Sequence, residues 1–169
     1  MPRAELSRIP GWYHGYVNQV KENDLESALT NNTSAALDFL STIPATKQDY
    51  RYAEGKWSVK EVFQHVIDAE RVFGYRALCI ARRDQTPLPS FDEDSYAKNS
   101  KAGNREWADM LAEFKSLRES NERMFRSFDG EQLESTGTAS GNSIYVLGIG
   151  FILVGHVTHH INVIRDRYM

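Results

Sequence analysis

Apolar residues recur at helical spacing in four long segments of this chain, and polar or turn-forming residues separate the segments. The segments are residues 24–43, 59–83, 105–128 and 143–166. In the third segment the apolar residues line one side, and the charged residues on the other side are predicted to face water. The pattern therefore predicts an all-α fold, in which four helices bury their apolar faces against one another in a four-helix bundle.

The second helix has the clearest start in the sequence. Ser58 and Glu61 form a capping box, in which each side chain bonds a free backbone N–H of the first turn. Trp57 and Val62 stand at the two positions that form a hydrophobic staple. These signals predict a helix that begins at residue 59 and ends near residues 83–84.

The other helix ends carry weaker signals. Asn23 is the expected N-cap of the first helix, with Glu26 as its partner three residues on, and Pro44 ends that helix. Asn104 is the expected N-cap of the third helix. Residues 11–20 are rich in aromatic side chains and are a candidate for a further short helix.

Two connections in the sequence are longer than a simple turn. Residues 85–103, which include Pro87 and Pro89, exceed the usual length of a helix connection. A crossover of this kind often covers one end of a bundle or a functional opening, and it allows a topology other than simple up-down-up-down. Residues 129–142 are small and polar, which predicts a loop or a short hairpin.

The fourth segment is apolar enough to need a membrane check. Residues 135–164 contain no Asp, Glu, Lys or Arg, and residues 144–164 are about long enough to span a bilayer. However, His156, Thr158 and Asn162 lie in the second half of this stretch, and each polar group would be costly in lipid. We therefore expect a central helix buried by its neighbours, and no membrane association.

Length and composition fit one globular domain over residues 1–169. The net charge is −3 and no run of Lys and Arg stands out, so a nucleic-acid partner is not expected. Cys79 is the single cysteine and lies among apolar residues, which predicts a small buried side chain and excludes an intrachain disulfide. With no apolar run at the start of the chain, these features predict a cytoplasmic protein.

Three of the five histidines lie within five residues of one another in the fourth helix. His156 and His160 are four residues apart and so share one helix face, while His156 and His159 are an alternative pair. His65 lies on the apolar stripe of the second helix and is the expected third member. Alone, a histidine at that position is more often a core residue with a hydrogen-bond partner than a metal ligand.

Three imidazoles that converge inside a bundle are difficult to satisfy with hydrogen bonds alone. A divalent metal ion solves that problem, because neutral imidazole is a good ligand for Zn, Ni, Fe and Cu. A cluster of packing histidines without metal is the alternative. Three protein ligands would leave a position open, as in catalytic zinc sites, where a water or a thiol can be activated.

Three motifs give the chain a family resemblance. They are WSVKEVFQHVIDAER at residues 57–71, LPSFDE at residues 88–93 and GHVTHH at residues 155–160. In order and spacing the sequence resembles the DinB-like (YfiT-like) superfamily from the first helix to the C-terminus. The resemblance implies a four-helix bundle, often a homodimer, with a divalent metal ion bound by His65, His156 and His160. Zinc or nickel is the expected ion, since imidazole binds both. His159 would then be a neighbour of the site.

The resemblance also implies an activity, although less sharply. Relatives include thiol S-transferases and a mycothiol-dependent isomerase, and many others are described only as metal-dependent hydrolases. The prediction is a metal-dependent thiol S-transferase that joins a low-molecular-weight thiol to small electrophiles. The alternatives are a hydrolase that uses metal-activated water, and a non-catalytic metal-binding or interaction module.

Charged residues near the motif histidines are further candidates. Asp68 is one turn after His65 and has the position to orient an imidazole, although a paired or solvated carboxylate is the more common outcome. Arg71 would either hold an anionic substrate or pair with a nearby acid. Three residues of the long loop are candidates for the border of the opening: Asp92, Asp94 and Tyr96.

Overall fold

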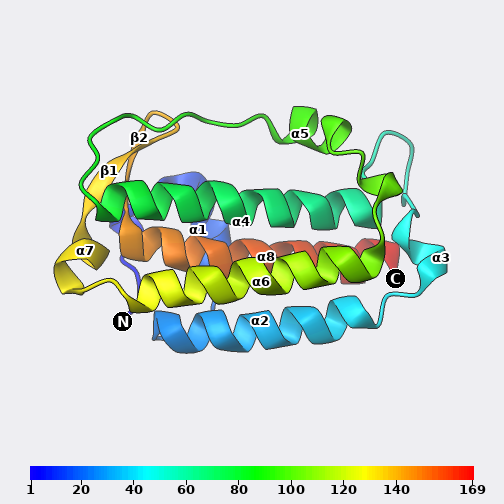
Figure 1. Ribbon diagram of the computed structural model, residues 1–169, viewed down its shortest axis with the longest axis horizontal. Helices are drawn as coiled ribbons and strands as arrows, with labels where there is room; N and C mark the ends of the chain where they lie inside the picture. Colours follow the sequence, from blue (N-terminus) through cyan, green and yellow to red (C-terminus); the bar gives the residue numbers. More distant parts are fainter.

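The computed structural model describes residues 1–169 and contains four long helices that lie side by side (Figure 1). Helix α8 packs against α2 and α4, and α6 packs against the same two helices from the opposite corner of the bundle. The prediction of an all-α four-helix bundle is confirmed. The four helices are α2 (Leu25–Ser41), α4 (Val59–Ala81), α6 (Trp107–Arg126) and α8 (Val146–Tyr168).

The chain does not run simply up and down through the bundle. In Figure 1, α2 and α8 run toward the end that holds the C-terminus, and α4 and α6 run the opposite way. Ring contacts agree, because Phe63 near the start of α4 lies 5.0 Å from Trp107 at the start of α6. The parallel pair α4 and α6 requires the chain to travel back along the whole bundle. Residues 82–106 make that return, as expected of the long connection.

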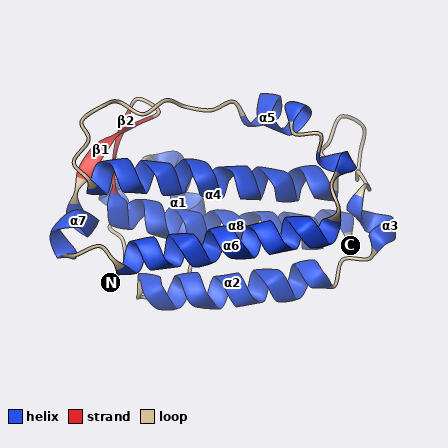
Figure 2. Cartoon of the chain, viewed as in Figure 1, coloured by secondary structure: helices blue, strands red, loops and turns tan.

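Short elements lie at the two ends of the bundle, where α3, α7 and the strands are seen, and along its sides, where α1 and α5 are seen (Figure 2). Both strands belong to one antiparallel hairpin, and its turn contains Ser140 and Gly141, both with positive φ. Such a turn matches the twist of the flanking strands. The short elements are η1 (Leu6–Arg8), η2 (Gly11–Tyr13), α1 (His14–Val17), α3 (Ala45–Gln48), α5 (Glu93–Asn99), η3 (Ala102–Asn104), α7 (Gly130–Glu134), β1 (Thr136–Ala139) and β2 (Asn142–Tyr145).

The start of α4 is as the sequence predicts. The Ser58 side chain accepts a bond from the Glu61 backbone N–H, and the Glu61 side chain accepts one from the Ser58 N–H. The helix ends at Ala81, and Arg83 adopts a left-handed conformation that turns the chain away. The predicted end was therefore two to three residues late.

Two predicted N-caps were wrong. Asp24, not Asn23, caps α2 by accepting a bond from the Ser27 N–H, and its carboxylate also pairs with the N-terminal amine at 2.9 Å. Glu26 accordingly makes no capping box and instead pairs with Arg126. Asn104 is wrong for the third helix, because it lies in η3 and α6 begins after Glu106 without a side-chain cap.

The connections hold more structure than the sequence predicts. The long crossover, expected as a loop over residues 85–103, contains α5 and the first part of η3, and Leu88 pairs with Ala139 at the hairpin. The segment 129–142 contains α7 and most of the hairpin. Residues 143–145 belong to β2, so α8 begins three residues later than expected. The aromatic segment 11–20 forms η2 and α1, as proposed.

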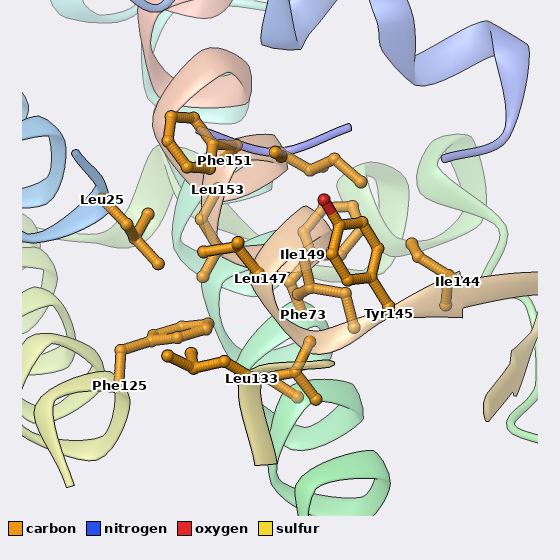
Figure 3. Close-up of a cluster of buried hydrophobic side chains, with 14 of the residues drawn as sticks. Leu25, Phe73, Phe125, Leu133, Ile144, Tyr145, Leu147, Ile149, Phe151 and Leu153 are labelled. Atoms are coloured by element: carbon orange, nitrogen blue, oxygen red, sulfur yellow. The ribbon is translucent and has the colours of Figure 1, made fainter. Parts of the chain in front are cut away.

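The apolar core is divided into two clusters by a polar layer. One cluster surrounds the first half of α8 (Figure 3), and the other packs around its second half and the start of α4. Between them, Arg118 donates to Glu70 at 2.7 Å and Asn121 donates to the second carboxylate oxygen at 2.8 Å. Thr33 accepts from Arg118, so the layer links α2, α4 and α6.

Helix α8 is the central helix of the bundle. It is long and apolar enough to cross a membrane, but 67% of its most apolar window is buried inside the protein. Three elements cover it: α1, α2 and α4. These contacts favour the interpretation of α8 as a core helix, and they explain why the sequence of α8 needs no charged residues before Arg165.

Candidate metal centre

The structure brings His65, His156 and His160 together at one point between α4 and α8. The Nε2 atom of His156 lies 3.1 Å from Nε2 of His65 and 3.1 Å from Nε2 of His160. One nitrogen of each ring lies within 4.8 Å of the others, and two of the three residues are buried. These are the three residues that the sequence predicts as metal ligands, and whether they bind metal stays a prediction.

Local structure explains the convergence. His156 and His160 are one helical turn apart on α8, and the capping box at Ser58 fixes where α4 begins and therefore which way His65 faces. Because α4 and α8 are antiparallel neighbours, the first turns of α4 lie beside the last turns of α8. His65 thus meets His156, which is 91 residues away in sequence, together with its neighbour His160.

The donor set fits a divalent metal ion better than a hydrogen-bonded cluster. A neutral imidazole Nε2 carries either one hydrogen or one lone pair, yet Nε2 of His156 faces two other Nε2 atoms at 3.1 Å. It can satisfy only one of them well. Zinc–nitrogen bonds of about 2.0–2.1 Å place the nitrogens of a tetrahedral site roughly 3.3 Å apart, close to the observed spacing.

Burial keeps the three imidazoles neutral. It lowers the pKa of His65 to about 4 and the pKa of His160 to about 2. Burial also lowers the pKa of His156 well below its ordinary value, with further lowering by the imidazoles of His160, His65 and His159. Neutral imidazole is the form that binds metal, so the site is prepared for an ion at physiological pH.

Aromatic side chains hold the histidine rings in place. The ring of His65 packs against Trp57 at 5.1 Å and stacks on Phe91 at 6.4 Å. His156 packs against Tyr16 at 5.4 Å. No polar group orients His65 from behind, because its Nδ1 atom is buried without a hydrogen-bond partner. Packing therefore orients the His65 ring, a role that a hydrogen bond to a carboxylate or carbonyl has in many metal sites.

Gly155 allows α1 to approach α8 next to the histidines. Replacing it with alanine is expected to lower the free energy of unfolding by about 1–3 kcal/mol, because overpacking typically costs this much. An added Cβ would lie 2.2 Å from the Tyr16 backbone oxygen. Urea denaturation measures the effect, and Gly15→Ala is the control because nothing lies within 4 Å of its added Cβ. Equal stability of the two variants would show that the close approach is unimportant.

Two adjoining cavities open onto the histidines. The histidine cavity, of about 310 Å³, is lined by all three rings and by Tyr13, Tyr16, Trp57, Phe73, Phe91, Glu93 and His159. The Lys56 cavity, of about 400 Å³, shares Trp57, His159 and His160 with it and also contains Lys56 and Asp94. The cluster is therefore accessible from outside, as a site that acts on a substrate must be.

The comparisons with known proteins agree with this architecture. The family model described as the DinB superfamily matches residues 28–164, which is most of the chain. The chain belongs to the DinB superfamily. A search of curated proteins found no match.

A solved DinB-like structure shares the fold. It is YfiT from Bacillus subtilis, described as a probable metal-dependent hydrolase with an unusual four-helix bundle topology. The likeness has a TM-score of 0.68 at 19% sequence identity, and covers 98% of this chain and 90% of YfiT. At this identity the comparison supports the fold, and the DinB resemblance predicted from the sequence is confirmed by the family match.

The other candidate residues named from the sequence lie outside the histidine cluster. Asp68 accepts a bond from Gln64 at 2.9 Å, and Arg71 pairs with Glu113. Asp92 caps α5, and Tyr96 is exposed beside Phe91. Among the loop residues named from the sequence, Asp94 borders the Lys56 cavity.

Some residues around the DinB site were missed from the sequence. Trp57 was recognised as a staple residue, but the pattern gave no sign that it also covers His65. Glu93 lines the histidine cavity and was not singled out. A signal was present, since the LPSFDE motif contains Phe91 and Glu93, both of which reach the histidine cavity.

Proposed function

We propose that this DinB protein is a metal-dependent hydrolase whose divalent ion is held by His65, His156 and His160. The observation that carries the proposal is the convergence of three neutral imidazoles at the wall of an open cavity with acidic residues at its rim. The fold shared with YfiT, a probable metal-dependent hydrolase, supports it.

Each side chain has a part in this proposal. When bound, a divalent ion would supply Lewis-acid chemistry to the cavity. The three histidines would hold the ion, and Trp57 and Phe91 shield the His65 ring from bulk water. Low exposure around the imidazoles strengthens every electrostatic interaction made there.

Asp94 is the residue to which we assign proton transfer. It shares the Lys56 cavity with His160, and its charge acts on His65, where it opposes the lowering of the pKa by burial. A carboxylate oxygen in this position can accept a proton from an attacking water and return it to the leaving group. Asp94 is exposed and lies in the first turn of α5, so the crossover between α4 and α6 brings it to the site.

Thiol S-transfer to small electrophiles is the second candidate. The aromatic walls of the histidine cavity, which include Tyr13, Tyr16 and Phe73, suit an apolar electrophile. A low-molecular-weight thiol with carboxylates would also need cationic partners close to the ion, and the histidine cavity itself is lined by Glu93 and by no Lys or Arg. The acidic rim therefore favours hydrolysis. The third possibility, a non-catalytic module, predicts bound metal without turnover.

One assay separates the three possibilities. The purified protein is stripped with a chelator, reloaded with zinc or nickel, and tested on nitrophenyl esters, and on chlorodinitrobenzene with cysteine or glutathione. We expect ester hydrolysis that disappears on stripping and returns with metal. Metal-dependent consumption of the electrophile with thiol, without ester hydrolysis, would favour transfer. Bound metal with neither activity would favour the non-catalytic module.

Metal affinity should depend little on pH in this protein. Protons compete with metal for histidine, and an ordinary histidine, with a pKa of about 6.5, begins to lose metal below that pH. Because burial lowers the pKa of His65 to about 4 and that of His160 to about 2, both remain neutral in mild acid. Zinc competition with a calibrated chelator between about pH 5.5 and 7.5 should give one affinity, whereas ordinary histidines would lose at least roughly tenfold.

Several further predictions from the sequence accompany this proposal. Zinc or nickel is the expected ion, because both bind imidazole well. We also propose that the chain forms a homodimer, that residues 1–169 are one domain, and that the protein acts on small molecules in the cytoplasm without a nucleic-acid or membrane partner. Size-exclusion chromatography with light scattering tests the dimer.

A further inference from the structure

Arg76 is a buried charge without a counterion. It belongs to the second half of α4 and is only 3% exposed, and no carboxylate is among its hydrogen-bond or ion-pair partners. Its Nη2 atom donates to the Pro89 carbonyl oxygen at 2.7 Å and to the Ser140 hydroxyl at 3.0 Å, both of which are neutral. Burying a charged group is costly unless it is paired.

The second buried arginine of the bundle shows what is missing. Arg118 is fully buried, and Glu70 accepts its hydrogen bond at 2.7 Å. Arg76 has no such acid, and the N–H groups on its other two nitrogens donate to no protein group. Neither of these two nitrogens is among the fully buried polar atoms without a partner, so each keeps a small exposed area.

The cavity beside Arg76 adjoins the histidine cavity. The Arg76 cavity, of about 360 Å³, is lined by Arg76 and Trp12, and shares Tyr13, Tyr16, Phe91 and Glu93 with the histidine cavity. The guanidinium carbon lies 5.6 Å from the Phe73 ring centroid, which in turn lies 5.9 Å from the His156 ring. Trp12 is 59% exposed at the open side, which leaves a large aromatic surface for a ligand.

We propose that Arg76 binds the anionic end of an elongated substrate, a carboxylate or a phosphate, whose apolar body lies on Tyr13, Tyr16 and Phe91. Its reactive bond then reaches the histidines. This inference rests on the proposed hydrolytic site for the bond that is cut, but the anion site itself does not. Guanidinium is well suited to both anions, since it offers several N–H donors in one plane.

Two features of the cavity could oppose this assignment. Arg76 also links the crossover at Pro89 to the hairpin at Ser140 by hydrogen bonds. These bonds involve neutral acceptors and only the Nη2 atom, so they leave the charge unpaired and the other two nitrogens free. Glu93 places a carboxylate in the same cavity, but it is exposed to solvent and not paired with Arg76. Water and salt therefore screen its repulsion of an anion.

Calorimetric binding of phenylhexanoate and of its neutral amide, phenylhexanamide, to the metal-loaded protein tests the anion site. We expect the acid to bind roughly 10-fold to 100-fold more tightly, as a hydrogen bond to a charged group implies. The preference should disappear in Arg76→Gln, persist in part in Arg76→Lys, and persist in His160→Ala. A phosphate probe, phenylbutyl phosphate, shows which anion binds more tightly, and a preference for either charged probe over the amide supports the site.

Two results would overturn the inference. The first is equal affinity of the parent protein for the acid and the amide. This result needs no variant, so it is decisive even if Arg76→Gln fails to fold. The second is a preference that survives Arg76→Gln but disappears in His160→Ala, because the acid would then bind at the histidines. Failure of the proposed hydrolysis is recognised separately, since an Arg76-dependent preference would remain in a protein that shows no metal-dependent turnover.

Discussion

Replacing His156 with alanine is expected to reduce kcat/KM for metal-dependent hydrolysis at least roughly 100-fold. Lewis-acid stabilisation by a metal ion contributes several kcal/mol, and each 1.4 kcal/mol of lost stabilisation is about tenfold in rate. His156 is the central member of the cluster, because its Nε2 atom lies 3.1 Å from both other Nε2 atoms. Steady-state kinetics of the reloaded parent and variant measure the loss.

The matched control is His159→Ala. His159 is on the same helix and lines the histidine cavity together with His156, but it is outside the three-histidine cluster. This variant should keep the metal and lose much less activity than His156→Ala. Circular dichroism shows whether both variants remain helical. Equal losses in the two variants would mean that the effect comes from the cavity wall and not from the cluster.

Replacing Arg118 with methionine is expected to lower the free energy of unfolding by about 3–5 kcal/mol, because removing one partner of a buried ion pair leaves an uncompensated charge. Glu70, which is 1% exposed, would keep its bond from Asn121 but lose its cation. Arg118 also donates to Thr33, so a link between α6 and α2 would be lost as well. Urea denaturation measures the change.

Two further variants make this prediction specific. Arg126→Met on the same helix removes an exposed ion pair with Glu26 and should change stability by less than about 1 kcal/mol. The double variant Glu70→Leu/Arg118→Met should recover part of the loss, since it leaves no unpaired charge. If Arg118→Met is as mild as Arg126→Met, the polar layer contributes little to the fold.

Local signals in the sequence were sufficient for much of this fold. The capping box of Ser58 and Glu61 needs only four consecutive residues, and its prediction is confirmed. The shared face of His156 and His160 follows from a spacing of four on one helix. That His65 would meet them depended on two distant helices becoming neighbours, so the family resemblance was needed in addition to the pattern.

Long-range contacts explain why the cap of α2 and the buried arginine were not predicted from the sequence. Asn23 and Asp24 are both good caps, and the choice is made by the N-terminal amine, which pairs with Asp24. Arg118 was not singled out from the sequence, because charged residues of this helix were expected to face water and an arginine is rarely buried without a partner. Its partner Glu70 lies 48 residues earlier, and no local pattern joins the two.

The central claim, that three histidines hold a divalent ion, is tested most directly by metal content. Protein purified without a histidine tag is analysed by mass spectrometry beside the double variant His156→Ala/His160→Ala. We predict near-stoichiometric zinc, nickel or another divalent metal in the parent and almost none in the variant. A parent that carries no metal and takes up none on titration would contradict the claim, and the cluster would then be a set of packing histidines.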